Sequence, residues 1–194
     1  MARRARRVPR NLGRSLIVGA AAGAAGAGAM TLLQRLLERA GADAHRSHPQ
    51  HALARGRPDS TAERQAAGID DATVEGVERL AGAAGLTLGP AAKEAAGPLA
   101  HYLFGAAVGA AYGLGTELAP RLAAGGGVPF GLAVWLLAEE VGIPAAGLAP
   151  PPHRTPAVVH VRGALAHVAY GATLELLRRL LSPRGAAQAR RAAR

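Results

Sequence analysis

Cysteine is absent from this 194-residue chain, and large aromatic side chains are scarce. Without cysteine there is no disulfide, no thiolate metal ligand and no cysteine nucleophile. Aromatic residues make up only 3% of the chain, so a water-soluble core would lack the side chains that usually dominate the free energy of burial. No nucleophile elbow, phosphate loop or dinucleotide-binding fingerprint is present, and residues 125–127 (Gly-Gly-Gly) are typical of a turn. We therefore expect no enzyme, no cofactor and no bound metal.

Alanine and glycine fill the apolar stretches in place of large side chains, and glycine alone occurs 26 times. Small residues gain little free energy from leaving water. They do let helix backbones approach closely, which is how helices associate in lipid. The composition therefore favours helices packed within a membrane.

Arginine gathers at both ends of the chain and accounts for most of its net charge of +10. Twelve of the 23 basic residues are terminal arginines, which leaves 11 basic residues against 13 acidic ones. The terminal arginines are Arg3, Arg4, Arg6, Arg7, Arg10, Arg14, Arg178, Arg179, Arg184, Arg190, Arg191 and Arg194. Because this charge brackets apolar stretches, it is typical of residues flanking membrane spans on the cytoplasmic side rather than of a nucleic-acid-binding protein.

Four apolar stretches have roughly the length that crosses a bilayer. They are residues 15–33, 99–116, 122–138 and 156–177. An even number of crossings puts both ends of the chain on one side, in agreement with a cytoplasmic position for the basic segments 1–14 and 178–194. We expect an all-α integral membrane protein, a compact four-helix transmembrane bundle.

The first stretch also has the features of a secretory signal peptide, namely a basic start, an apolar centre and small residues at Ala27-Gly28-Ala29. Its helical pattern continues through Leu36 and Leu37 without a breaker, however. We therefore expect a retained anchor rather than a cleaved leader.

Two connecting segments differ in character. Residues 40–96 are polar and predict an extramembrane loop with one or two short helices near the membrane surface. Pro90 starts a further helical stretch, where its missing N–H does no harm. Residues 142–155 are rich in proline and glycine and predict a rigid, extended connector.

Glycines recur at helical spacing in each expected span. Gly105, Gly109 and Gly113 follow one another at intervals of four, which places them on one stripe of a helix. The other helix-packing candidates are Gly19, Gly23, Gly127, Gly131, Gly163 and Gly171. We expect a tight bundle, with the alternative that the helices need a separate partner to pack.

Ionisable residues within or beside the apolar stretches are candidates for a proton or cation site, because each costs free energy in lipid unless paired or hydrated. The candidates are His101, Glu117, Glu140, His160, His167 and Glu175. In the last span, His160 and His167 lie about 20° apart on a helical wheel and Glu175 lies within about 80° of either. The alternative is that His167 makes a structural hydrogen bond and that the glutamates, Glu139 included, are helix-end charges. No HxxxH or ExxH spacing supports a metal.

The second half of the chain resembles the YagU-like family of small bacterial inner-membrane proteins of unknown function. The resemblance covers about residues 99–181 and runs through three of the expected spans. It is carried by His101, Phe104, Gly109, Tyr112, Gly113, Glu117, Pro120, Gly131, Trp135, Pro144, Gly147, Leu148, Pro150, Pro151, Gly163, His167, Glu175, Arg178 and Arg179. It implies a multi-pass protein of the bacterial inner membrane, with one family member linked to acid tolerance, and it carries over no catalytic residues.

Two functions follow as hypotheses. The first is a membrane protein that modulates proton or cation balance, or acid tolerance, through its intramembrane histidines and glutamates. The second is a structural or assembly subunit that packs against another membrane protein, or a second copy, through its glycine faces. In either case we expect anionic lipid headgroups beside the arginines and no nucleic-acid partner.

Overall fold

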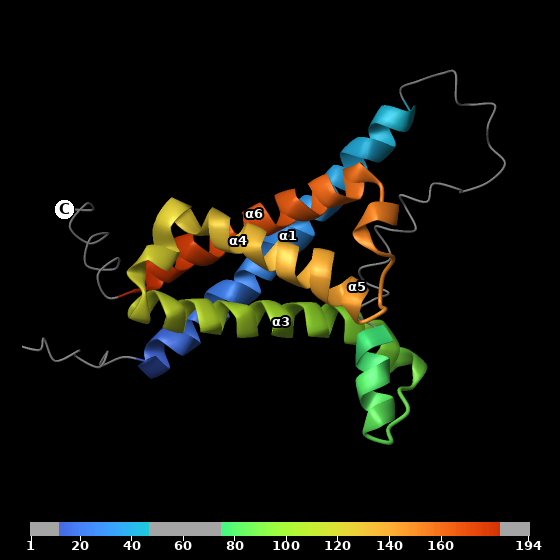
Figure 1. Ribbon diagram of the computed structural model, residues 1–194, viewed down its shortest axis with the longest axis horizontal. Helices are drawn as coiled ribbons and strands as arrows, with labels where there is room; N and C mark the ends of the chain where they lie inside the picture. Colours follow the sequence, from blue (N-terminus) through green and yellow to red (C-terminus); the bar gives the residue numbers. More distant parts are fainter. Residues whose placement is uncertain (1–11, 47–74, 183–194) are drawn as a thin grey trace, which may run out of the picture.

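The computed structural model describes residues 12–46 and 75–182, and every element within them is a helix. Three long helices, α1 (Leu12–Arg46), α3 (Pro90–Leu118) and α6 (Ala157–Leu181), account for most of these residues. A short helix over residues 75–83 precedes α3 and stands at a steep angle to it (Figure 1). The remainder of the expected polar loop, residues 47–74, lies outside the described part.

The fourth membrane-length element is a continuous helix made of three consecutive pieces. These are α4 (Val128–Trp135), a wider π-helical stretch, η3 (Leu136–Gly142), and the final turn α5 (Ile143–Ala145). A 3-10 stretch, η2 (Pro120–Gly127), leads into it from α3. A second 3-10 turn, η4 (Pro152–Arg154), lies in the connector before α6.

Several helix boundaries differ from those expected from the sequence. The helix expected over 122–138 begins instead at Val128, because Gly125, Gly126 and Gly127 all adopt positive φ and turn the chain, and it continues to Ala145. The first helix is also longer than 15–33, since no breaker stops it before Arg46. α3 begins at Pro90, as the sequence predicts, so the segment between the first two long helices is shorter than 40–96.

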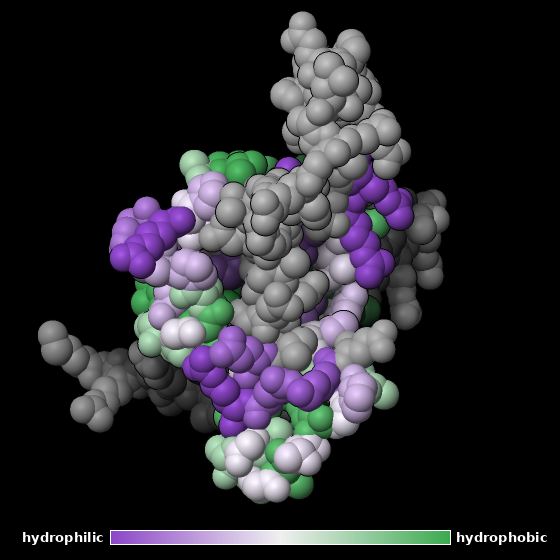
Figure 2. Space-filling model, turned by 90° about the vertical axis from the view of Figure 1, so that its right-hand side faces the viewer, coloured by the Kyte–Doolittle hydropathy of each residue, from purple (hydrophilic) through white to green (hydrophobic). Residues whose placement is uncertain are grey.

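The helices run alternately up and down. α1 packs against both α3 and α6, and α4 packs against α6 (Figure 1). The start of α1 therefore meets the end of α6, where Arg14 Nη2 donates to Leu181 O at 3.3 Å. We call this end, with Arg14, Arg178 and Arg179, the arginine end. The opposite end, where α3 and α6 begin, carries several groups of hydrophilic residues (Figure 2).

Glycine brings the backbones of α1 and α3 into direct contact. A Cβ atom on Gly19 or Gly23 would come within 3.0 Å of the backbone of α3, and one on Gly109 or Gly113 would come equally close to α1. At such separations glycine Cα–H groups face carbonyl oxygens across the interface, a weak but repeated attraction. The same geometry joins the end of η2 and the start of α4 to α6, where Gly127 and Gly171 face one another and Gly131 faces His167 O. Gly105 lies on the same stripe of α3 as Gly109 and Gly113, and a Cβ on Gly105 would meet the Ala27 side chain.

Large apolar side chains point outward from all four long elements, whereas the interior holds mostly alanine, glycine, tyrosine and polar side chains, with Met30 and Leu174 as its large aliphatic members. Ile17 on α1, Leu103 on α3, Leu137 beyond α4 and Leu176 on α6 are each at least 58% exposed. The buried hydrophobic residues are Ala22, Ala27, Met30, Ala96, Tyr112, Ala166, Tyr170 and Leu174. A water-soluble bundle has the reverse arrangement, because transfer of large side chains out of water stabilises it most.

Two stretches among the described residues are long and apolar enough to cross a membrane, by length and composition. They are Leu12–Leu37 and Pro120–Ala145. α3 and α6 are long enough but less apolar, because glycine, tyrosine, histidine and glutamate occupy their inward faces. The described part of the chain is therefore all-helical with two candidate spans.

Candidate functional site

The π-helical stretch η3 carries two adjacent carboxylates, Glu139 and Glu140, and directs both toward α6. Its wider turn shows in the bond from Ile143 N–H to Ala138 O, five residues back. Consecutive residues of an α-helix point about 100° apart, so two neighbouring side chains rarely reach one partner helix. π-helical turns are uncommon and are frequent at functional sites. Here the turn makes two carboxylate–histidine pairs with one helix.

The outer pair joins Glu140 and His160 near the opposite end of the bundle. His160 Nδ1 lies 2.6 Å from Glu140 Oε1, and His160 Nε2 lies 3.1 Å from Pro152 O. A carbonyl oxygen can only accept, so Nε2 carries a proton. Nδ1 then either donates to an ionised Glu140 or accepts the proton of a neutral one. The pair thus holds one proton between two groups and remains 25% and 14% exposed at its two side chains.

The inner pair joins Glu139 and His167, deeper in the bundle. Their side chains are 14% and 6% exposed, and His167 Nδ1 lies 3.7 Å from Glu139 Oε1. That distance is too long for a hydrogen bond, and Nδ1 donates instead to Gly163 O in its own helix at 3.0 Å. His167 therefore lies beside a carboxylate, and the structural hydrogen bond of the alternative interpretation is also present.

Trp135 and Gly163 complete the surroundings of the inner pair. A Cβ on Gly163 would lie 2.6 Å from Glu139 Oε2 and 3.0 Å from Trp135 Nε1, so only glycine leaves room for both groups. Trp135 Nε1 is buried and has no hydrogen-bond partner among the described residues. A buried donor without an acceptor is costly.

Glu175 belongs to a separate network at the arginine end. It is 1% exposed and accepts hydrogen bonds from Tyr112 Oη at 2.9 Å, from Arg178 Nε at 2.7 Å and Nη2 at 2.9 Å, and from Arg179 Nε. An arginine guanidinium stays charged at physiological pH, so these are charge-assisted hydrogen bonds. With this many donors, Glu175 is held as an anion rather than left free to exchange protons.

The other two candidates lie elsewhere. Glu117 is exposed at the arginine end and accepts from Ser15 Oγ at 3.1 Å. His101 lies between α3 and α1, where its Nε2 is 3.5 Å from Thr31 Oγ1 and 3.4 Å from Ala27 O. The six residues singled out from the sequence are thus divided among five places, and His160 and Glu175 alone are separated by about 22 Å along α6.

Glu139 and Trp135 are the site residues that sequence reasoning passed over. The sequence marks Glu139 as an ionisable residue of an apolar stretch, but nothing in the local sequence shows that a π-helical turn directs it inward, and it is not among the six candidates. The available signal was a pair of adjacent carboxylates within an apolar stretch, where a single charge is already expensive. Among the described residues, no three His, Cys, Asp or Glu side chains are placed to hold a metal ion.

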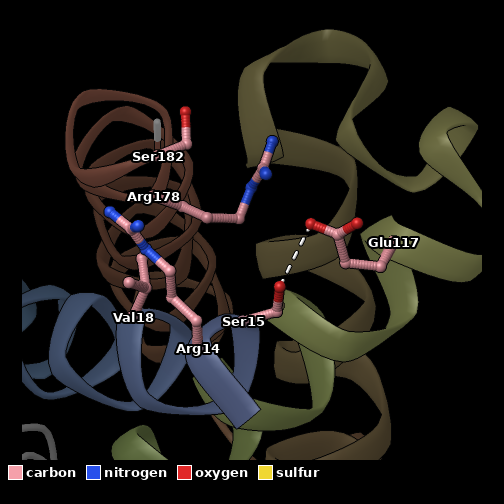
Figure 3. A pocket seen from close by; sticks show the side chains of 7 residues that line it. Arg14, Ser15, Val18, Glu117, Arg178 and Ser182 are labelled. Carbon is pink, nitrogen blue, oxygen red and sulfur yellow. Dashed lines mark hydrogen bonds between the residues drawn. The ribbon is translucent and has the colours of Figure 1, made fainter. Parts of the chain in front are cut away.

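A small hollow at the arginine end lies between α1, α3 and α6. It has a volume of about 50 Å³ and is lined by Arg14, Ser15, Val18, Gly113, Glu117, Arg178 and Ser182 (Figure 3). Arg14 and Ser15 on α1, Glu117 on α3 and Arg178 on α6 lie around it, and Ser15 Oγ donates to the Glu117 carboxylate (Figure 3).

The Tyr112 hydroxyl offers a direct measure of the Glu175 network. We expect Tyr112→Phe to lower the free energy of unfolding by about 1 kcal/mol, because the buried carboxylate loses one donor. Tyr102→Phe is the matched control, since Tyr102 is 40% exposed and its hydroxyl has no hydrogen bond to the described residues. Denaturant unfolding in detergent measures both. Equal losses in the two variants would contradict this role of the network.

Comparison with known proteins gives a family without an assigned activity. Residues 87–176, just under half of the chain, match a family described as "Protein of unknown function (DUF1440)". No curated protein and no solved structure matches the chain. The match covers α3, α4, both carboxylate–histidine pairs and most of α6. It indicates an uncharacterised family, and the YagU-like resemblance stays an interpretation of the sequence.

Proposed function

We propose that the chain is a four-span membrane protein that takes up protons through the carboxylate–histidine pairs of η3 and α6, and so modulates proton balance or acid tolerance. The spans are α1, α3, the continuous helix from α4 to α5, and α6. Supporting this arrangement, each of the four exposes large apolar side chains, and alanine, glycine and polar side chains make up most of the interior. In lipid this arrangement is stable, because the side chains facing outward meet hydrocarbon and the polar groups meet one another.

The arginines orient this bundle. The arginine end, with further arginines in the segments 1–11 and 183–194, would face the cytoplasm of a bacterial cell, under the rule that cytoplasmic flanks are basic. α1 would be retained, since α3 and α6 both pack against it. The outer pair would then lie near the external face and the inner pair nearer mid-membrane.

The Glu140–His160 pair is the observation that carries the proposed function. Its 2.6 Å separation, with His160 Nε2 committed to Pro152 O, leaves one proton shared between the carboxylate and the imidazole. Histidine exchanges protons near neutral pH, and the pair is partly exposed. A proton that enters here has a second acceptor pair, Glu139 and His167, two turns deeper along α6. The two pairs form the outer half of a proton path.

A flux measurement in liposomes tests this function. Full-length protein is reconstituted with a trapped pH-sensitive dye, and a potassium gradient with valinomycin drives protons inward. We expect faster acidification than in protein-free liposomes, with a rate that rises as the external pH falls through the titration range of histidine. A rate equal to that of protein-free liposomes at every pH would overturn the proposal.

We favour this function over a structural subunit that docks through its glycine faces. Those faces are filled within the chain, Gly19 and Gly23 against α3 and Gly171 against Gly127. A partner, or a second copy, would therefore have to bind elsewhere. Crosslinking in native membranes that recovers one stoichiometric partner would favour the subunit function instead.

A further inference from the structure

The hollow at the arginine end has the chemistry of an anion site. Two of its lining groups are guanidiniums, and they come from helices far apart in the sequence, Arg14 on α1 and Arg178 on α6 (Figure 3). Guanidinium groups match phosphate oxygens in geometry as well as in charge.

The start of α1 adds to the positive potential. Arg14 and Ser15 belong to its first turn, where the backbone N–H groups have no acceptor within the helix. The 35-residue helix also directs the positive end of its dipole toward this point, and no acidic residue lies in its first turn. The hollow thus combines two guanidiniums with a helix N-terminus, a combination that favours phosphate.

Both carboxylates at this end are already occupied. Glu175 is enclosed by Tyr112, Arg178 and Arg179. Glu117, which lines the hollow, accepts from Ser15 Oγ at 3.1 Å. Against these two negative charges stand three guanidiniums, including Arg179. An excess of positive charge therefore remains, and Arg14, which donates to Leu181 O within the described part of the chain, contributes to it.

We infer that this hollow between α1, α3 and α6 holds the phosphate of one anionic lipid headgroup. The inference rests on the proposed four-span arrangement, in which the hollow lies at headgroup level, where α1 enters the membrane and α6 leaves it. A volume of about 50 Å³ accommodates a phosphate group and leaves the remainder of the lipid outside. The bound headgroup would tie the first and last helices together at the cytoplasmic surface.

Native mass spectrometry of the full-length chain in detergent tests the site with phosphatidylglycerol, phosphatidylcholine and inorganic phosphate as probes. We expect one tightly retained phosphatidylglycerol, with about tenfold weaker retention by Arg14→Gln, because one charge-assisted contact is lost. Arg35→Gln is the matched control, since it removes an exposed arginine from the other half of α1. Arg178 is left intact because it also supports Glu175.

Each other result counts against the inference. Equal retention by Arg14→Gln and Arg35→Gln would show that the arginines hold lipid only as diffuse charge. Displacement by inorganic phosphate at equal concentration would make free phosphate the ligand, and equal binding of phosphatidylcholine would remove the role of net charge. The site and the proton path are separable, because Arg14→Gln is expected to leave proton flux unchanged.

Discussion

Replacing Gly109 with valine is expected to prevent the bundle from assembling. A Cβ at this position would lie within 3.0 Å of Gly19 O and 2.6 Å from Gly23 Cα, both of which are backbone atoms. Backbone cannot move aside as a flexible side chain can, so α1 and α3 would have to separate along their shared face. Overpacking alone costs about 1 to 3 kcal/mol, and here the close contacts on either side are lost as well. We expect a decrease of at least about 3 kcal/mol in the free energy of unfolding.

Gly28→Ala is the matched control for this prediction. Gly28 lies on α1 and faces α3, but a Cβ there would meet only the Tyr102 ring, at 3.8 and 3.9 Å. Those are ordinary van der Waals separations, so we expect stability within about 0.5 kcal/mol of the parent chain. Both variants are measured by denaturant unfolding in detergent and by size-exclusion chromatography. A folded, monodisperse Gly109→Val protein would show that the helices do not meet at this face.

Replacing Glu139 with glutamine is expected to reduce proton flux by about a hundredfold, the scale on which positioned proton-transfer groups act. Glutamine keeps the size of the side chain beside Gly163 and Trp135, but it cannot take up a proton. Because Glu139 is the carboxylate nearest to His167, its loss interrupts the path between the outer pair and the middle of the bundle. The measurement is the initial rate of acidification in reconstituted liposomes.

Two controls separate a proton role for Glu139 from a structural one. Glu75→Gln removes a carboxylate whose partner is Arg79, in an exposed ion pair that contributes little to stability, and should leave the flux unchanged. The unfolding midpoint of Glu139→Gln should remain within a few degrees of the parent chain. If flux persists in Glu139→Gln at the parent rate, the inner pair is no part of a proton path.

Much of the helical architecture follows from local signals in the sequence. Pro90 begins α3 because proline is favoured in the first turn of a helix, and residues 125–127 turn the chain because glycine adopts positive φ freely. Such features depend on residues within a few positions of one another.

The site depends on features that local sequence does not encode. The direction of Glu139 results from a π-helical turn, whose formation depends on how residues 136–142 pack against α6. Glu175 shares a face of α6 with His167, but it is bonded to Arg178 and Arg179 of the same helix and to Tyr112 of α3, whereas Glu139 lies beside His167. The arginine pairs follow from spacing along α6, and the contacts with Tyr112 and Glu139 do not. The position of a residue in a helix gives the direction of its side chain around the helix axis. Which residue of another helix it meets at that level of the bundle depends on the tertiary fold.

The four-span arrangement is the central claim, and its most direct test is the accessibility of single cysteines in intact cells. Because the chain has no cysteine of its own, each introduced thiol reports one position without background. We predict that a membrane-impermeant maleimide labels Ala84→Cys and Ala149→Cys from outside, and labels Ala119→Cys and Ser182→Cys only after the cells are opened. Labelling of all four positions from the outside would contradict the account.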